Sequence, residues 1–118
     1  MTQAKLIVLS VENKPGAVAT AIGALAEAEV NLLSIFGWSP QGVLQVIVDN
    51  PAKATAVLDR LGIAWSQEQA EIAELPNKPG ALHTYLADLA TKGVNLRSLS
   101  GFASADDQKS FVVWTAEK

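Results

Sequence analysis

The feature that most constrains this chain is an internal repeat. The five residues N-K-P-G-A at positions 13–17 recur letter for letter at positions 77–81. At the same offset the chain stays in register without a gap, so that V-N-L at 30–32 falls on V-N-L at 94–96. About half of the positions from 13 to 37 are identical in the second copy. Such self-similarity predicts two copies of one supersecondary unit.

The length of the chain limits how these copies can fold. The chain has 118 residues, of which 49% are hydrophobic and 18% charged, which is the composition of a compact folded protein. Each copy holds only about 60 residues, a size that buries roughly 60% of its unfolded surface and is marginal alone. We therefore expect the two halves to support each other or to rely on a second chain.

The first half, residues 1–67, is predicted to be one complete module. Short β-branched runs predict strands, and apolar residues at intervals of three and four predict amphipathic helices. The resulting order β-α-β-β-α-β is the ferredoxin-like arrangement. The predicted elements are strands at 5–10, 31–39, 43–49 and 63–66, helices at 15–29 and 51–61, and a turn at 40–42.

The second half, residues 68–118, is predicted to be a shortened copy that follows a link at 67–70. It lacks a second helix and a fourth strand, so its order is β-α-β-β. The expected fold class is α+β, with two tandem ferredoxin-like modules, an antiparallel sheet and helices on one face. The predicted elements are strands at 71–75, 95–103 and 109–115 and a helix at 79–92.

The repeated motif resembles the ACT domain, a small amino-acid-sensing module attached to many enzymes of amino-acid metabolism. Both copies combine N-K-P-G after a strand, a helical pattern, and V-N-L at the start of the next strand. The second copy is similar to the regulatory subunits of acetolactate synthase. The resemblance implies a stand-alone tandem ACT protein with a truncated second repeat. Such a protein would bind an amino acid at a seam between modules and act as an allosteric regulator.

The repeated turn has two interpretations that the sequence leaves open. In the structural one, Asn13 and Asn77 cap the helices, proline is preset for the first helical turn, and glycine supplies backbone freedom. In the functional one, unpaired N–H groups at the positive end of each helix bind an α-carboxylate, and glycine lets the ligand approach the backbone.

The resemblance to the regulatory domain of some 3-phosphoglycerate dehydrogenases implies which residues hold the ligand. There, an Asn in the turn and an Asn at the second strand of the adjoining domain bind the amino acid, and amides offer both a donor and an acceptor. That family has a His two residues before the turn Asn, where this chain has Val11 and Leu75, which argues against serine. Alternatively, the strand asparagines only satisfy the loop backbone. The expected ligand-binding residues are Asn13, Lys14, Pro15, Gly16, Ala17, Asn31, Leu32, Asn77, Lys78, Pro79, Gly80, Ala81, Asn95 and Leu96.

Two arrangements of the modules are considered. ACT domains join by pairing their second strands, but within one chain this places the fourth strand roughly 29 Å from the next first strand. The link between them spans only about 17 Å when extended. In the alternative, the strand at 63–66 lies between the first strands of both halves, and the seam forms between two chains. We expect a homodimer in either arrangement, because an incomplete module leaves an open sheet edge.

Composition and motifs argue against most other functions. The net charge is −3 and the nine Lys and Arg are scattered, so a nucleic-acid partner is not expected. The chain has no Cys and only His83, so neither a metal site nor a catalytic relay can be assembled, and it carries no cofactor motif. The N-terminal apolar run is too short for a signal peptide or a membrane span, so a cytoplasmic location is expected.

Three alternative functions are weighed. The first is a ligand-free regulatory or assembly subunit that docks on a partner enzyme of amino-acid metabolism. The second is an RNA-recognition module, but residues 108–114 lack its basic-glycine-aromatic signature and the pI is near 5.0. The third is an enzyme such as an acylphosphatase, which would need an arginine in a turn that carries Lys14 or Lys78 instead. We therefore expect no catalytic residues.

Overall fold

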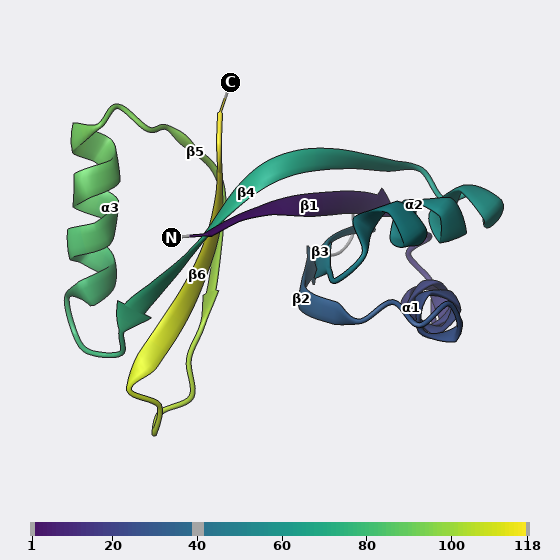
Figure 1. The fold of residues 1–118 in the computed structure, drawn as a ribbon, viewed down its shortest axis with the longest axis horizontal. Helices are drawn as coiled ribbons and strands as arrows, with labels where there is room; N and C mark the ends of the chain where they lie inside the picture. The colour runs from purple at the N-terminus through teal and green to yellow at the C-terminus, as the bar shows by residue number, and fades with distance from the viewer. Residues whose placement is uncertain (1, 39–41, 118) are drawn as a thin grey trace. The chain divides into compact units, whose positions relative to one another are not determined.

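The chain folds as an α+β protein. The computed structural model describes residues 2–38 and 42–117 (Figure 1). The predicted turn at 40–42 and the predicted strand at 31–39 therefore lie partly outside the described residues. Its strands are hydrogen-bonded in the order β2-β3-β1-β4-β6-β5. The elements are β1 (Thr2–Ser10), α1 (Ala17–Glu27), β2 (Leu32–Trp38), β3 (Val43–Val48), α2 (Pro51–Arg60), β4 (Trp65–Pro76), α3 (Ala81–Thr91), β5 (Leu96–Phe102) and β6 (Lys109–Ala116).

The chain divides into two compact units. The first unit is Lys5–Glu68, and the second unit is Met1–Ala4 together with Gln69–Lys118. The long strands β1 and β4 therefore contribute residues to both units. In the second unit, the side-chain amide of Gln3 donates a hydrogen bond to the Glu71 carboxylate at 3.2 Å. The second half thus has residues from the start of the chain beside its first strand.

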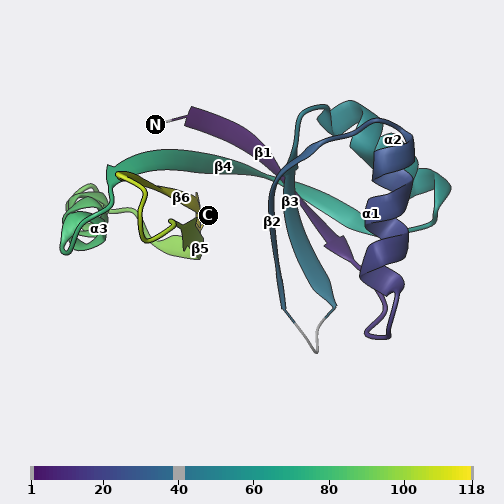
Figure 2. The same cartoon turned by 90° about the horizontal axis from the view of Figure 1, so that it is seen from below.

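In the first unit, α1 and α2 cover one face of the strands. β3 pairs antiparallel with both β1 and β2, so alternate residues of all three strands share this face. Figure 2 shows the two helices on the same side of the strands. The largest of the fully buried side chains lie there: Ile7, Leu9, Leu25, Val46 and Leu58.

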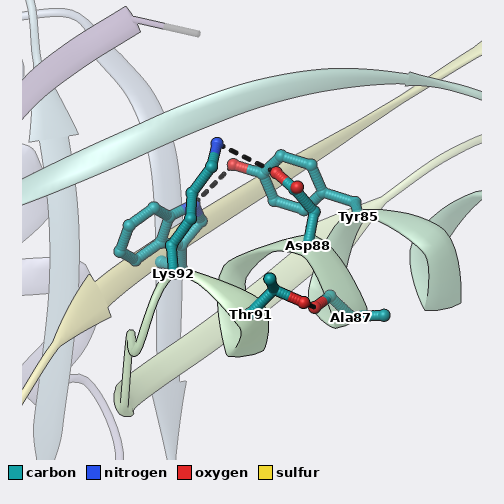
Figure 3. A network of polar contacts seen from close by, with 6 residues as sticks. Tyr85, Ala87, Asp88, Thr91 and Lys92 are labelled. Atoms are coloured by element: carbon teal, nitrogen blue, oxygen red, sulfur yellow. Dashed lines mark hydrogen bonds and ion pairs between the residues drawn. The ribbon is translucent and has the colours of Figure 1, made fainter.

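In the second unit, α3 is attached to β6 by a side-chain hydrogen bond. The indole N–H of Trp114 donates to the hydroxyl of Tyr85 at 2.7 Å, and Trp114 is almost fully buried. Figure 3 marks this bond at the Tyr85 hydroxyl with a dashed line. The neighbouring ion pair between Lys92 and Asp88, at 3.0 Å on α3, is exposed. The buried hydrogen bond is therefore the polar contact that should matter for stability.

Replacing Tyr85 with phenylalanine should lower the free energy of unfolding by about 1 kcal/mol, because it leaves a buried indole N–H without this acceptor. Urea unfolding monitored by circular dichroism would measure the change. Lys92→Ala is the control, with an expected loss below about 0.5 kcal/mol because its ion pair is exposed. Equal effects of the two substitutions would contradict the assignment.

The structure corrects the prediction for the middle of the chain. The end of the predicted strand at 63–66, the link at 67–70 and the predicted strand at 71–75 form one continuous strand, β4. β4 pairs with β6 over Glu71–Pro76 and lies next to β1 in the strand order. Just before β4, the carbonyl of Ala64 accepts the N–H of Ser10 at 3.1 Å. The predicted link at 67–70 ends at Ala70, which is fully buried in β4. Backbone pairing with neighbouring strands here overrides weak local propensity.

The strand order differs from both expected arrangements of the modules, because residues 63–66 do not form a separate strand between two first strands. β2 and β5 are the two terminal strands of the order, and β4 lies between β1 and β6. The arrangement in which the second strands of both halves pair within one chain is therefore wrong. The physical reason is that β1 and β4 pair with each other as well as with β3 and β6, which leaves β2 and β5 at the edges.

Candidate functional site

The two copies of N-K-P-G-A fold into the same turn. In each copy the lysine N–H donates to the carbonyl two residues earlier, at 2.9 Å for Lys14 and 3.0 Å for Lys78. In each copy the glycine has a left-handed backbone, with φ of 86° at Gly16 and 88° at Gly80. The same five residues therefore impose the same local conformation in both units.

The glycines, and not the asparagines, cap the helices. Helix α1 begins one residue after Gly16 and α3 one residue after Gly80, and no side chain caps either start. The predicted helix starts at positions 15 and 79, and the predicted caps by Asn13 and Asn77, are wrong. An N-cap side chain reaches the second or third helical N–H from the residue directly before the helix, and each Asn lies three residues before the cap.

The first turns of α1 and α3 can accept an anionic group. Gly16 and Gly80 occupy the cap positions without a side-chain hydrogen bond, so the helix starts are not satisfied by a capping side chain. Both turns are exposed. The free N–H groups of a helix start carry partial positive charge and suit a carboxylate.

Asn77 anchors the loop between β5 and β6. Its amide nitrogen donates to the carbonyl of Ser104 at 3.0 Å and to that of Asp107 at 2.8 Å. Its backbone N–H donates to the carbonyl of Gln108 at 2.9 Å. Because both amide hydrogens are engaged in the loop, only the side-chain oxygen of Asn77 can serve a ligand, as an acceptor from an ammonium group.

The strand-start asparagines, Asn31 and Asn95, are exposed and directly precede β2 and β5. The backbone of Asn31 is held by Asp49, whose carboxylate accepts its N–H at 3.0 Å and whose N–H donates to its carbonyl at 3.0 Å. The carbonyl of Asn95 accepts the N–H of Glu117 at 2.7 Å. These hydrogen bonds use the backbone atoms of Asn31 and Asn95, so they fix the backbone positions from which the two side chains project.

Within one unit the turn and the strand-start asparagine lie at opposite ends of the sheet. β1 and β2 run parallel, because each pairs antiparallel with β3. Asn13 follows the end of β1, whereas Asn31 precedes the start of β2. In the second unit, β4 and β5 both pair antiparallel with β6, so Asn77 and Asn95 are separated in the same way. A single unit therefore does not bring the two kinds of asparagine together.

Each unit also has a cavity beside its turn. In the first unit a cavity of about 600 Å³ borders Lys14, Ala17 and Thr20. The Lys14 ammonium there is paired with Glu12 at 2.9 Å. In the second unit a cavity of about 460 Å³ borders Leu82, in the first turn of α3, and the neighbouring strands β5 and β6. Sequence reasoning missed this second cavity.

Other site types find no support in the described part of the chain. Residues 2–38 and 42–117 contain no group of three or more His, Cys, Asp or Glu side chains placed to hold a metal ion. None of the helices within those ranges is long and apolar enough to cross a membrane. Among the described residues, a clear pKa shift is found at Lys109, whose hydrogen bond to Glu74 and attraction to the Glu74 charge raise the pKa of Lys109.

Comparison with known proteins identifies the family of the chain. No protein-family model matches the sequence, and no curated protein does. Protein BT0572 from Bacteroides thetaiotaomicron is 30% identical in sequence to this chain. Its crystal structure matches with a TM-score of 0.86, over 98% of this chain and 81% of that chain. The chain belongs to the family of protein BT0572.

The BT0572 family shares its fold with regulatory subunits of aspartate kinase. The ligand-free subunit from Thermus thermophilus is 15% identical, with a TM-score of 0.65, over 95% of this chain and 82% of that chain. E. coli aspartokinase III in complex with lysine and aspartate is 13% identical, with a TM-score of 0.62, over 97% of this chain and 28% of that one. The predicted α+β, ACT-like fold class is confirmed by these likenesses.

Proposed function

We propose that this BT0572-family protein is a regulatory protein that binds an amino acid at a seam between ACT-like modules. The observation that carries the proposal is the repeated turn, in which Gly16 and Gly80 have the same left-handed backbone at an exposed helix start. An α-carboxylate fits the free N–H groups at such a start. Aspartate kinases, which share this fold, support an amino acid as the ligand, because one of them was crystallised with lysine and aspartate.

The seam in this proposal joins two copies of the chain. Each unit alone separates its turn from its strand-start asparagine, so a complete site needs an asparagine from a further module. The terminal strands β2 and β5 are free to pair with a second copy. Leu33 and Ile35 on β2 are 63% and 51% exposed, which favours their burial in a homodimer.

Regulation follows if the ligand binds one arrangement of the modules better than another. A ligand shifts a conformational equilibrium only by the difference between its affinities for the two states. Lys14, Pro15 and Ala17, with Lys78, Pro79 and Ala81, shape the two turns in this proposal, and Leu32 and Leu96 support the strand starts. No residue of the site has a catalytic role in it.

The proposal is tested by thermal unfolding of the purified chain with each of the twenty amino acids in excess. A ligand at about 100 times its Kd stabilises the native state by about 2.7 kcal/mol, which raises the Tm measurably. We expect such a rise for one or two amino acids. No rise with any of them would overturn the proposal.

The double substitution Asn31→Ala and Asn95→Ala should weaken binding of that amino acid by about tenfold or more, because each removes a hydrogen-bonding group from a charged ligand. Both side chains are exposed, so the Tm without ligand should change little. Titration calorimetry measures the affinity. Unchanged affinity would exclude these residues from the site.

A second candidate function is a ligand-free subunit that docks on a partner enzyme. Phe102 and Phe111 favour it, because they face each other across β5 and β6 and are 74% and 49% exposed. Exposed aromatic pairs of this kind are common in protein interfaces. Stable co-purification with one enzyme, together with no response to amino acids, would select this candidate.

A further inference from the structure

The cavity of the second unit is lined by apolar side chains from three elements. Leu82 comes from the first turn of α3, Leu99 from β5 and Val112 from β6. Gly101 lies beside Val112 in the cavity wall, where it contributes no side chain. The volume of about 460 Å³ lies within the range of about 300–1,000 Å³ that is typical of small-molecule sites.

The first unit differs at the matching place. Gly37 corresponds to Gly101 in the repeat, and its cross-strand partner is Leu44, where Gly101 has Val112. A Cβ atom built on Gly37 would collide with Cδ2 of the Leu44 side chain. At Gly101 the nearest side-chain atom to such a Cβ is Val112 Cγ2, at 3.8 Å. Leucine therefore occupies the space over the glycine in the first unit, whereas the smaller valine leaves it open in the second.

The chemistry of the lining selects the kind of ligand. None of the side chains that line the cavity is charged, and its side-chain polar groups are the hydroxyls of Ser100 and Ser110. The nearby Lys109 ammonium is paired with Glu74 at 2.6 Å. An apolar ligand side chain would cover the partly exposed surfaces of Leu82 and Leu99 here, whereas a charged side chain would find no ionic partner among the lining residues.

We propose that the chain binds one ligand, in the second unit, and that this ligand is a neutral amino acid with an apolar side chain. Its side chain occupies the cavity between Leu82, Leu99 and Val112, and its carboxylate lies at the start of α3. This inference rests on the proposed amino-acid-binding function and adds the ligand class and the stoichiometry.

The test is titration calorimetry of the full chain with leucine, phenylalanine, lysine and aspartate. We expect leucine or phenylalanine to bind with a stoichiometry of one per chain and the charged amino acids not to bind. Tighter binding of lysine or aspartate, or two ligands per chain, would overturn this inference while leaving the proposed function standing. If no amino acid binds, both are overturned.

Two substitutions locate the site. Val112→Leu fills the cavity as Leu44 does in the first unit, and the added methylene should weaken binding by about 10–200-fold. Leu44→Val, the reciprocal change in the first unit, should leave the affinity unchanged. An effect of Leu44→Val that equals the effect of Val112→Leu would overturn the assignment to the second unit.

A third substitution tests the same site even if the Val112→Leu variant does not fold. Leu82→Glu changes a side chain that is 45% exposed, so the fold should tolerate it. Its carboxylate would stand at the cavity and repel the ligand carboxylate, and binding should fall at least as far as in Val112→Leu. Full retention of binding in Leu82→Glu would place the ligand elsewhere.

Discussion

Replacing Leu25 with alanine is expected to lower the free energy of unfolding by about 2–5 kcal/mol. Leu25 lies on α1, is fully buried, and belongs to the core of the first unit with Ile7 and Leu58. The substitution removes buried apolar surface and leaves a cavity that the surrounding strands and helices only partly fill. Because small proteins are stable by only about 5–15 kcal/mol, this single change removes a large part of the total.

Urea unfolding, followed by circular dichroism, measures this effect. Leu33→Ala is the matched control, because the same atoms are removed from a side chain that is 63% exposed. Its expected effect is within about 0.5 kcal/mol. If the two variants lose similar stability, the first unit does not have the core described above. A stability loss for Leu33→Ala only at high protein concentration would instead indicate that β2 is buried in a dimer.

Replacing Gly16 with alanine should destabilise the protein by about 1–2 kcal/mol, because an L-residue with a side chain is strained in the left-handed region. Its φ is 86°, and an added Cβ would meet no atom within 4 Å. The loss therefore reports backbone strain and not a steric clash. Gly80→Ala should behave alike, since its φ is 88° and it has equally open surroundings.

Gly23→Ala provides a control with the opposite sign. Gly23 lies inside α1, is exposed, and also has no atom within 4 Å of an added Cβ. Alanine should stabilise the helix there by about 0.5–1 kcal/mol. Thermal unfolding of the variants should thus move the Tm in opposite directions. A stabilising effect of Gly16→Ala would contradict the left-handed cap.

Most of the local structure of this protein can be predicted from the sequence. The hydrophobic periodicity predicted three helices and most strands, and the structure places them close to the predicted positions. The helix starts were wrong by two residues because the left-handed conformation of Gly16 and Gly80 depends on backbone angles that no periodicity reveals. Pro15 and Pro79 were predicted to be the first helical residues, although each precedes the cap glycine; Pro51 does begin α2.

The candidate site could be predicted only in part from the sequence. The repeat singled out both turns, yet it did not reveal that Asn77 is bonded to Ser104 and Asp107 in the following loop. These partners are distant in sequence, and a side chain's choice among distant carbonyls depends on how the hairpin folds back. The repeat did align Gly37 with Gly101, which was the one available signal of the cavity.

By itself, the sequence determined the repeated unit, its order of elements and the identical turns, because five residues in the same order meet the same local steric limits in both copies. Only the tertiary structure decided that residues 65–76 form one strand, that β2 and β5 are the edge strands, and that Val112 leaves open the space that Leu44 fills. The physical reason is that strand pairing and side-chain packing join residues far apart in the chain. Their energies depend on neighbours that no local pattern specifies.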